Sequence, residues 1–193
     1  MDSIRIFGYK SFKKLSVQLH PINLLIGANG AGKSNFLSLF EMLGNIYEKR
    51  LGAYVAQVGG VDKLLYQGRK VTDRIAVNLL IAKSEYDLAL LEADGKLIVE
   101  REVVGCYDDV CPLDLVRKNV ITEYQSESSL KNHKEEDLSN YISQIRKFHF
   151  HDTGRRSPFT ADSHIVNDAY RMYEHGENLA AILYRIQREK PVA

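Results

Sequence analysis

The chain lacks several features that mark specialised classes of protein. It has no tryptophan, four prolines and two cysteines among its 193 residues. No apolar run approaches the length of a membrane span, and the N-terminus does not resemble a signal peptide. The formal net charge is +1, so overall charge gives no argument for a nucleic-acid partner. We therefore expect a cytoplasmic globular protein with no membrane partner.

The two cysteines do not predict a metal site. Cys106 and Cys111 are too loosely spaced for a usual zinc ligand pair, and the chain has no second pair. His133 lies too far along the chain to complete a familiar site. We expect two ordinary reduced thiols. The composition, 45% hydrophobic and 26% charged, is typical of a protein with at least one full core.

The most specific feature is a glycine-rich motif at residues 27–34. It reads Gly-Ala-Asn-Gly-Ala-Gly-Lys-Ser and matches G-x-x-x-x-G-K-[ST], the phosphate-binding loop of nucleoside-triphosphate sites. The apolar segment Ile22–Ile26 before it predicts a short buried strand. The residues after it, 35–43, carry apolar side chains at helical spacing. Strand, loop and helix therefore follow in the order that this chemistry requires.

Each part of the motif has a role in holding a triphosphate. The glycines let the backbone curl so that successive N–H groups point inward, and the helix N-terminus adds a partial positive charge. Lys33 would bring a full charge to the β- and γ-phosphates, and the Ser34 hydroxyl would ligate Mg²⁺. The alternative is a glycine-rich turn that precedes a helix by chance. The predicted ligands of ATP–Mg²⁺ are Gly27, Ala28, Asn29, Gly30, Ala31, Gly32, Lys33, Ser34 and Asn35, with Ser34 as the metal ligand.

The remaining pattern predicts an α/β fold. Asp94-Gly95 is a strong hairpin signal between two apolar alternating runs. Strands are expected at 3–7, 15–19, 75–81, 86–92, 97–104 and 148–150. Helices are expected from Lys33 to near Gly44 or a few residues beyond, at 61–65 (one turn), from Asp137 to about 147 with Leu138, Tyr141, Ile142 and Ile145 inward, within 162–173, and from 176–179 to about 189. Residues 52–70, 107–136 and 152–164 are expected to be mostly loop, with 107–136 a polar surface excursion.

These residues resemble the start of a RecF/SMC-type ABC ATPase head. The resemblance rests on Tyr9-Lys-Ser-Phe12 and on Ile22–Phe36, and it is closest to the bacterial AAA-family ATPases that include OLD-like and anti-phage defence ATPases. Segments 148–153 and 176–180 also resemble that group. The resemblance implies a P-loop NTPase of ABC lobe I type, with a mixed sheet around the loop helix and an antiparallel meander. It implies a lobe I at 1–150 and a linker with a helix at 151–193.

The resemblance also implies a biological setting. ATP binding would be coupled to assembly in DNA repair, DNA maintenance or phage defence. The expected partners are a second copy or a second ATPase head, a nuclease effector and, as a further candidate, DNA. In that family a basic residue after the first strand reaches the phosphates, so Lys10 is an additional nucleotide ligand, and Lys13 is weighed beside it. Both could instead be solvated surface lysines.

In the family that the chain resembles, a second lobe carries the Walker B strand and the signature motif. Both motifs are missing from this sequence. Residues 90–94 end in the hairpin Asp-Gly rather than in the Asp-Glu of a Walker B strand, and residues 97–100 lack the aspartate. No Ser-Gly-Gly or Ser-Asp-Gly signature follows the loop. Either the chain is truncated, or it is naturally short, or another chain supplies these parts. We predict ATP binding and assign no catalytic residue. A nucleotide-gated assembly module with little hydrolysis stays open, as does a P-loop phosphotransferase, which the antiparallel meander disfavours.

Some polar residues are weaker candidates. A residue that senses Mg²⁺ and the γ-phosphate is expected within 149–153 rather than at a glutamine. A basic cluster late in the chain could contact a DNA backbone or simply form a solvated loop. The sensor candidates are Gln67, Gln144, His151 and Asp152, and the basic cluster is Arg146, Lys147, Arg155 and Arg156.

Overall fold

The computed structural model describes residues 1–106, 117–133, 136–148, 170–173 and 176–189. The chain divides into two compact units, residues 1–145 and 146–193. The first unit is a sheet with helices packed on it. In the second unit the described residues include one helix, α5 (Leu179–Glu189).

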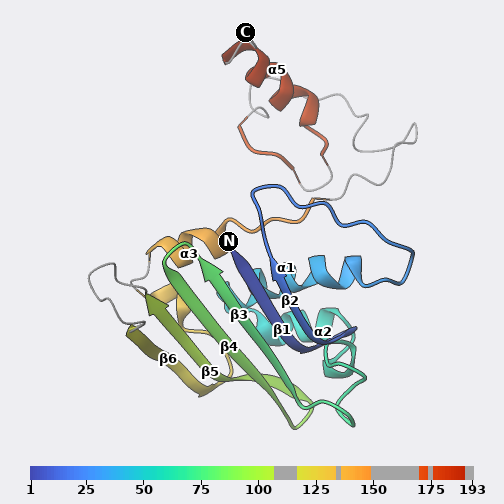
Figure 1. The fold of residues 1–193 in the computed structure, drawn as a ribbon, viewed down its shortest axis with the longest axis vertical. Helices are drawn as coiled ribbons and strands as arrows, with labels where there is room; N and C mark the ends of the chain where they lie inside the picture. The colour runs from blue at the N-terminus through green and yellow to red at the C-terminus, as the bar shows by residue number, and fades with distance from the viewer. Residues whose placement is uncertain (107–116, 134–135, 149–169, 174–175, 190–193) are drawn as a thin grey trace. The chain divides into compact units, whose positions relative to one another are not determined.

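A six-stranded antiparallel sheet forms the first unit (Figure 1). Its strand order is β2-β1-β3-β4-β5-β6, so only the β1–β3 neighbours are not consecutive in the chain. The tight turn between β4 and β5 contains Asp94 at φ 50° and Gly95 at φ 78°. Such left-handed pairs match the twist of adjacent strands. The strands are β1 (Ser3–Tyr9), β2 (Phe12–Gln18), β3 (Arg74–Ile81), β4 (Ser84–Ala93), β5 (Lys96–Cys106) and β6 (Arg117–Gln125).

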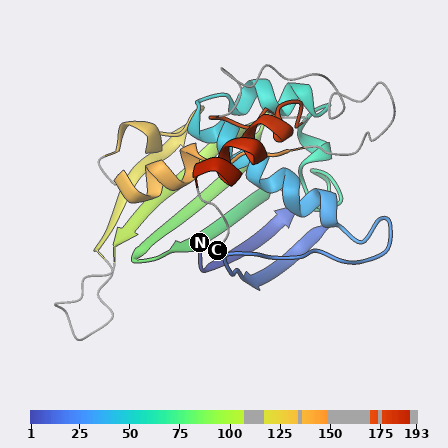
Figure 2. The same cartoon turned by 90° about the horizontal axis from the view of Figure 1, so that it is seen from above.

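Helices cover one face of this sheet (Figure 2). The buried face of α1 packs in the same hydrophobic core as alternate residues of the strands, for example Leu39 and Met42 with Ile4 and Ile75, which are all 0% exposed. Period 3.6 on the helix and period 2 on the strands place these side chains together. The helical elements of this unit are α1 (Lys33–Tyr47), α2 (Leu51–Gln57), η1 (Val61–Lys63), η2 (Leu130–Asn132) and α3 (Glu136–Ser143).

A buried carboxylate joins three strands to the segment after β6. Glu102 of β5 is fully buried, and its oxygens accept hydrogen bonds from the hydroxyls of Tyr86, Ser128 and Thr122 at 2.5, 2.6 and 2.9 Å. The backbone N–H of Ser129 donates a fourth bond at 2.9 Å. Burial, followed by the nearby Glu102 charge, raises the pKa of Tyr86, so its phenol remains a donor.

The strand predicted at Ile22–Ile26 is absent, which is the main correction to the predicted fold. The segment has no regular secondary structure, with Ile22 in a bend, and it pairs with no described strand. Ile22, Leu24 and Ile26 are 90, 82 and 84% exposed. A strand needs a hydrogen-bonding neighbour, and the described chain provides none here. For the same reason the expected mixed sheet is wrong for the described residues, where every pairing is antiparallel.

Most of the other predicted elements are confirmed, and some are wrong. Strands near 3–7, 15–19, 75–81, 86–92 and 97–104, the helix from Lys33, the turn at 61–65 and the helix ending at 189 are confirmed. The loops expected at 52–70 and 107–136 were partly wrong, because they overlap α2 and contain β6. The helix at 137–147 ends earlier, at Ser143, and Tyr141, predicted inward, is 43% exposed. The predictions at 149–164 lie outside the described residues, as does most of 162–173.

Candidate functional site

The phosphate loop, residues 27–34, ends on an uncapped helix N-terminus. No side chain caps α1, and Gly30 and Gly32 have φ values of +83° and +93°. Within the loop the N–H of Ala31 donates to the carbonyl of Ala28 at 3.2 Å. Among the residues that the structure describes, the N–H groups of Gly30, Gly32, Lys33 and Ser34 donate to no acceptor. A row of such amides at a helix N-terminus is suited to bind an anion.

Lys33 is turned toward the loop that precedes it. Its ammonium nitrogen donates to the carbonyl oxygens of Gly27 and Ala28, each at 2.7 Å. The positive charge is therefore held over the start of the loop rather than directed into bulk solvent. Ser34, the next residue, is exposed, so its hydroxyl is accessible to a metal ion from solution.

The turn between β1 and β2 supports the loop from behind. A Cβ on Gly32 would lie 3.1 Å from the Ser11 Oγ and 3.2 Å from the ring of Phe12. The side-chain amide of Asn35 donates to the same Ser11 Oγ at 3.0 Å. Glycine is thus favoured at position 32 both by the left-handed backbone and by the close approach of this turn.

Lys10 lies beside the second turn of α1. Its backbone is left-handed, with φ 47°, and its ammonium group donates to the Oγ of Ser38 at 2.8 Å. The hydroxyls of Tyr9 and Ser38 are 2.9 Å apart, and Tyr54 donates to the Ser38 carbonyl at 3.3 Å. Burial, the largest cause, raises the pKa values of both tyrosines, so they remain neutral.

A hollow of about 840 Å³ opens between Lys10, Asn35 and the segment 62–70; we call it the α1 hollow. Its charged lining is mostly basic, with Lys63, Arg69 and Lys70 beside Lys10, against the single carboxylate of Asp62. The Arg69 backbone N–H and Nε donate to that carboxylate at 2.9 and 3.1 Å. These hydrogen bonds, the backbone one first, lower the pKa of Asp62. The hollow therefore favours a polar, anionic occupant.

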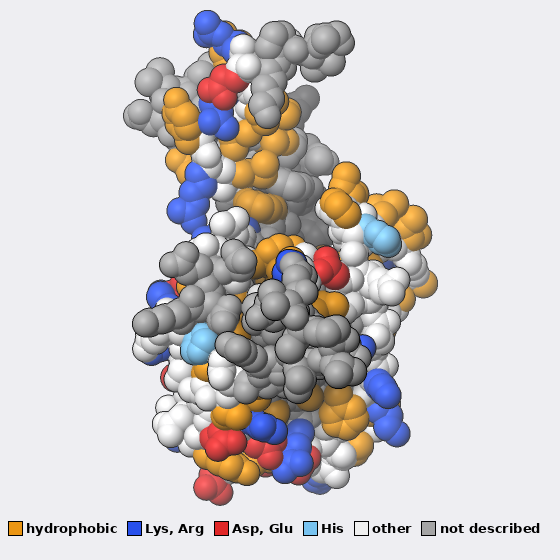
Figure 3. Space-filling model, turned by 60° about the vertical axis from the view of Figure 1, so that its left-hand side comes forward, with side chains coloured by type: hydrophobic (Ala, Val, Ile, Leu, Met, Phe, Trp, Pro, Cys, Tyr) orange, Lys and Arg blue, Asp and Glu red, His pale blue; other side chains and the backbone are white. Residues whose placement is uncertain are grey.

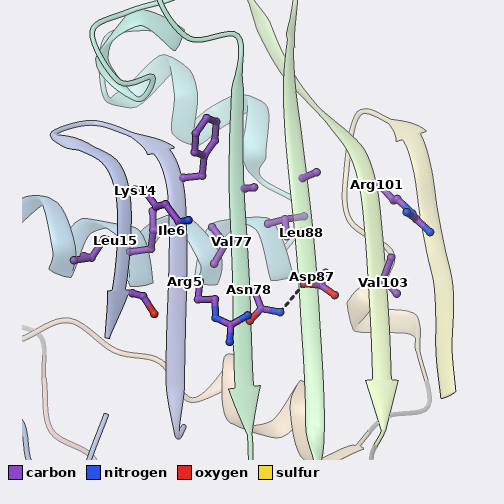
Figure 4. Close-up of a pocket in the computed structure, with 14 residues that line it drawn as sticks. Arg5, Ile6, Lys14, Leu15, Val77, Asn78, Asp87, Leu88, Arg101 and Val103 are labelled. Atoms are coloured by element: carbon purple, nitrogen blue, oxygen red, sulfur yellow. Dashed lines mark hydrogen bonds between the residues drawn. The ribbon is translucent and has the colours of Figure 1, made fainter. Parts of the chain in front are cut away.

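A second hollow, a groove of about 570 Å³, lies on the open face of the sheet, opposite the helices (Figure 4). Its lining is largely apolar, but Arg5, Lys14 and Arg101 contribute positive charge. Within this groove Asn78 of β3 donates to Asp87, its partner on the adjacent strand β4, at 2.6 Å. No residue of the phosphate loop lines it, so it is separate from the predicted nucleotide site.

Comparison of the chain with models of known protein families gives a match, which covers the phosphate loop. The family model described as "AAA ATPase domain" matches residues 1–178. The chain belongs to the AAA ATPase domain family. The match spans the phosphate loop, the α1 hollow and the whole sheet of this AAA ATPase domain, and it indicates ATP binding. A search of curated proteins gave no match to the chain.

The structure of this ATPase domain brings several predicted residues together. The phosphate loop and Asn35 are contiguous, and Asn35 shares the α1 hollow with Lys10 and Gln67. Lys13 and Gln144 are exposed and do not line it. The side chain of Cys106 and the residues Cys111, His151, Asp152, Arg155 and Arg156 lie outside what the structure describes, so those predictions are untested.

Sequence reasoning missed the residues that surround the loop. Ser11 and Phe12 back Gly32, Ser38 holds Lys10, and Arg69 positions Asp62 at the rim of the α1 hollow. Ser38 had a signal, since it falls near Lys33 on the same helix. Ser11 and Phe12 stand in the segment 9–12 that carries the family resemblance, but their contact with Gly32 was not predicted. In the described part of the chain, no helix is long and apolar enough to cross a membrane and no cluster of His, Cys, Asp or Glu could hold a metal ion.

Proposed function

We propose that this ATPase domain binds ATP with Mg²⁺ at the phosphate loop. The observation that carries the proposal is the set of backbone N–H groups at the start of α1 that have no acceptor among the described residues. They lie beside the Lys33 ammonium group, and the left-handed glycines hold the backbone curled. A polyanion would satisfy these donors together.

The residues present fit both the nucleotide and the metal ion. The loop amides and Lys33 would hold the β- and γ-phosphates, and the exposed Ser34 hydroxyl would take one ligand position of Mg²⁺. The ion would supply positive charge that neutralises the phosphate oxygens. Lys10 and the basic rim of the α1 hollow extend the positive potential beyond the loop. We propose that these residues contact another polar part of the same nucleotide.

Binding without rapid hydrolysis is the form of activity that the described residues favour. Asp62 is the one carboxylate that lines the α1 hollow, and Arg69 engages it through three nitrogens. It is thus poorly placed to orient an attacking water. We propose that the domain is a nucleotide-gated assembly module, which would pair with a second copy or another ATPase head. The antiparallel sheet speaks against a phosphotransferase, whose sheets are usually parallel.

The cellular role is proposed from the resemblance to RecF/SMC-type and OLD-like ATPases. On that basis the domain acts in DNA repair, DNA maintenance or phage defence, with a nuclease effector and DNA as partners. A cytoplasmic location is part of the same proposal. Measurement of DNA binding by the purified chain at several salt concentrations tests the proposed DNA partner.

The proposed function is tested by calorimetric titration of the purified chain with ATP, ADP and AMP, with Mg²⁺ and with EDTA. We expect ATP to bind more tightly than AMP, because the loop addresses the β- and γ-phosphates. Removal of Mg²⁺ should weaken ATP binding and leave AMP binding unchanged. Equal affinities for ATP and AMP would show that the phosphate loop is not the binding site.

A further inference from the structure

The groove on the open face of the sheet has a floor made by a single row of residues that crosses the strands. Each member of the row is the direct cross-strand partner of the next, from β2 through β1, β3 and β4 to β5. The row is Lys14, Phe7, Ala76, Ala89 and Arg101. Directly paired residues share one face of a sheet, and all five line the groove. The groove therefore runs across the strands rather than along one of them.

Both ends of this row are basic. Lys14 lies on the edge strand β2 and is exposed, and Arg101 lies on β5 with 58% of its side chain exposed. The close-up shows these two side chains on opposite sides of the groove (Figure 4). Four strand spacings of about 4.8 Å separate their backbones, which gives roughly 19 Å. Arg101 pairs with Glu123 at 3.8 Å, but both side chains are more than half exposed, so this pair is weak.

The middle of the row is apolar and has small side chains. Ala76 and Ala89 are partly exposed, and their methyl groups keep the floor low. Phe7 beside them is 45% exposed. In the next row of the sheet, Asn78 already donates to the Asp87 carboxylate. The groove, with a volume of about 570 Å³, thus offers an apolar centre between two positive ends.

The shape and chemistry of the groove suit an α-helix. The strands beneath its centre, β1, β3 and β4, have a hydrogen-bonded neighbour on both sides, so the groove presents side chains and no free strand edge. An extended peptide laid across it would leave many of its own backbone groups unpaired, whereas a helix satisfies its backbone internally. A length of roughly 19 Å corresponds to about 13 residues of α-helix, which is an ordinary helix length.

We propose that the groove on the open face is the docking site of an amphipathic α-helix from a partner protein. The helix would cross the strands with small and apolar residues over Ala76 and Ala89. Acidic residues at its two ends would face Lys14 and Arg101, and this complementary charge would fix its position along the groove. No residue of the phosphate loop lines the groove, so the proposal is independent of ATP binding.

A nucleic acid fits the groove less well than such a helix. Phosphates repeat along the whole length of a nucleic acid and are bound by cations along the whole path. The centre of this groove is instead apolar, and the carboxylate of Asp87 lines it. At the lower end of the face drawn in Figure 3, acidic and basic side chains are likewise intermingled rather than separated by sign.

The test uses a synthetic peptide of about 14 residues, stapled to keep it helical. It carries alanine and leucine along one side, glutamine along the other and two glutamates at each end. Added to the isotope-labelled chain without nucleotide, it should shift the amide NMR signals of Phe7, Ala76 and Ala89 and leave those of the phosphate loop in place. An unstapled peptide with two central prolines, which cannot form the helix, should bind at least about fivefold more weakly.

Charge reversal tests the two ends of the groove. Lys14→Glu and Arg101→Glu should each weaken binding of the acidic-ended peptide by about threefold or more. Each should strengthen binding of a second stapled peptide that has lysines in place of the glutamates. Lys13→Glu, on the same strand as Lys14 but outside the groove, is the matched control and should leave both affinities unchanged. Thermal denaturation checks that each variant is folded.

A substitution on the floor tests the apolar centre. Ala76→Gln places a larger, uncharged side chain in the path of the helix and should weaken binding of both stapled peptides by about fivefold or more. Its partly exposed position on the open face means that the core is not overpacked. Lys33→Ala should bind the peptide as the wild type does, which separates failure of this site from failure of the nucleotide site.

Several results would overturn the proposal. One is the absence of shifts at Phe7, Ala76 and Ala89 with the stapled peptide, and another is equal binding of the proline-containing peptide. Salt-sensitive shifts of the same signals with duplex DNA, where the peptide produces none, would assign the groove to a nucleic acid. A dimer of the chain alone that Ala76→Gln dissociates would assign the groove to a second copy.

Discussion

The ammonium nitrogen of Lys33 lies 2.7 Å from the carbonyl oxygen of Gly27, the first residue of the same loop. This contact closes the phosphate loop on itself. It holds a positive charge beside amides that have no acceptor among the described residues. The loop is therefore arranged for an anion in advance, which lowers the ordering that binding must supply.

Replacement of Lys33 by alanine should abolish measurable ATP binding. The substitution removes the only full charge within the loop, and charge-assisted bonds to phosphate are the strong ones. Calorimetry with ATP and Mg²⁺ measures the effect, and circular dichroism checks the fold, which should be unchanged because the side chain lies outside the core. Lys96→Ala, at an exposed hairpin position, is the matched control and should bind ATP normally. Wild-type affinity in Lys33→Ala would show that the site is elsewhere.

The two left-handed glycines of the loop should differ in their tolerance of alanine. Gly30→Ala introduces backbone strain alone, since nothing lies within 4 Å of the new Cβ, and should lower the free energy of unfolding by about 1 kcal/mol. Gly32→Ala adds close contacts with Ser11 and Phe12 and should lower it by about 2 kcal/mol or more. Urea denaturation compares the two variants. Equal losses would mean that the turn behind Gly32 can move aside.

Lys10 should contribute to ATP affinity, whereas Lys13 should not. Asparagine is the useful replacement because it tolerates the left-handed backbone at position 10. Lys10→Asn removes a charge from the α1 hollow and should weaken ATP binding by about tenfold. Lys13→Asn, at an exposed position outside that hollow, should have no effect. Equal behaviour of the two variants in the titration would remove Lys10 from the nucleotide site.

Local sequence patterns predicted most of the sheet but not its edges. The meander β3–β5 was predictable because its apolar residues alternate and Asp94-Gly95 marks a turn. β6 was missed because its exposed edge carries charges such as Glu123, which is how natural edge strands avoid aggregation. α2 was missed because Gly52 and the later pair Gly59-Gly60 read as loop, although Leu51, Tyr54 and Val55 have helical spacing and are buried.

Tertiary context explains the other failures. Ile22–Ile26 has the composition of a strand, but local sequence does not show whether a neighbouring strand is available. The phosphate loop was predictable because a short motif encodes it. Ser11 and Phe12 were not, because their role depends on how the β1–β2 turn packs against Gly32. The Glu102 network depends likewise on residues that are distant in the chain.

Glu102 should be essential for stability although it lies far from the loop in sequence. Glu102→Gln replaces one of the two acceptor oxygens with an NH₂ group, which donates. The new N–H donors would face either the donors of Thr122 and Ser129 or the donors of Tyr86 and Ser128. The free energy of unfolding should fall by about 2–4 kcal/mol. Glu123→Gln, on an exposed side chain paired with Arg101 at 3.8 Å, should change it by less than about 0.5 kcal/mol. If thermal or urea denaturation showed Glu102→Gln to be as stable as the wild type, this interpretation of the network would be refuted.

Amide NMR spectra of the labelled chain test most directly whether the backbone amides at the start of α1 bind the phosphates. On addition of ATP and Mg²⁺, we predict large shifts at Gly30, Gly32, Lys33 and Ser34, and none in the groove on the open face of the sheet. Signals of the loop that stay in place while ATP is present in excess would contradict ATP binding at this loop.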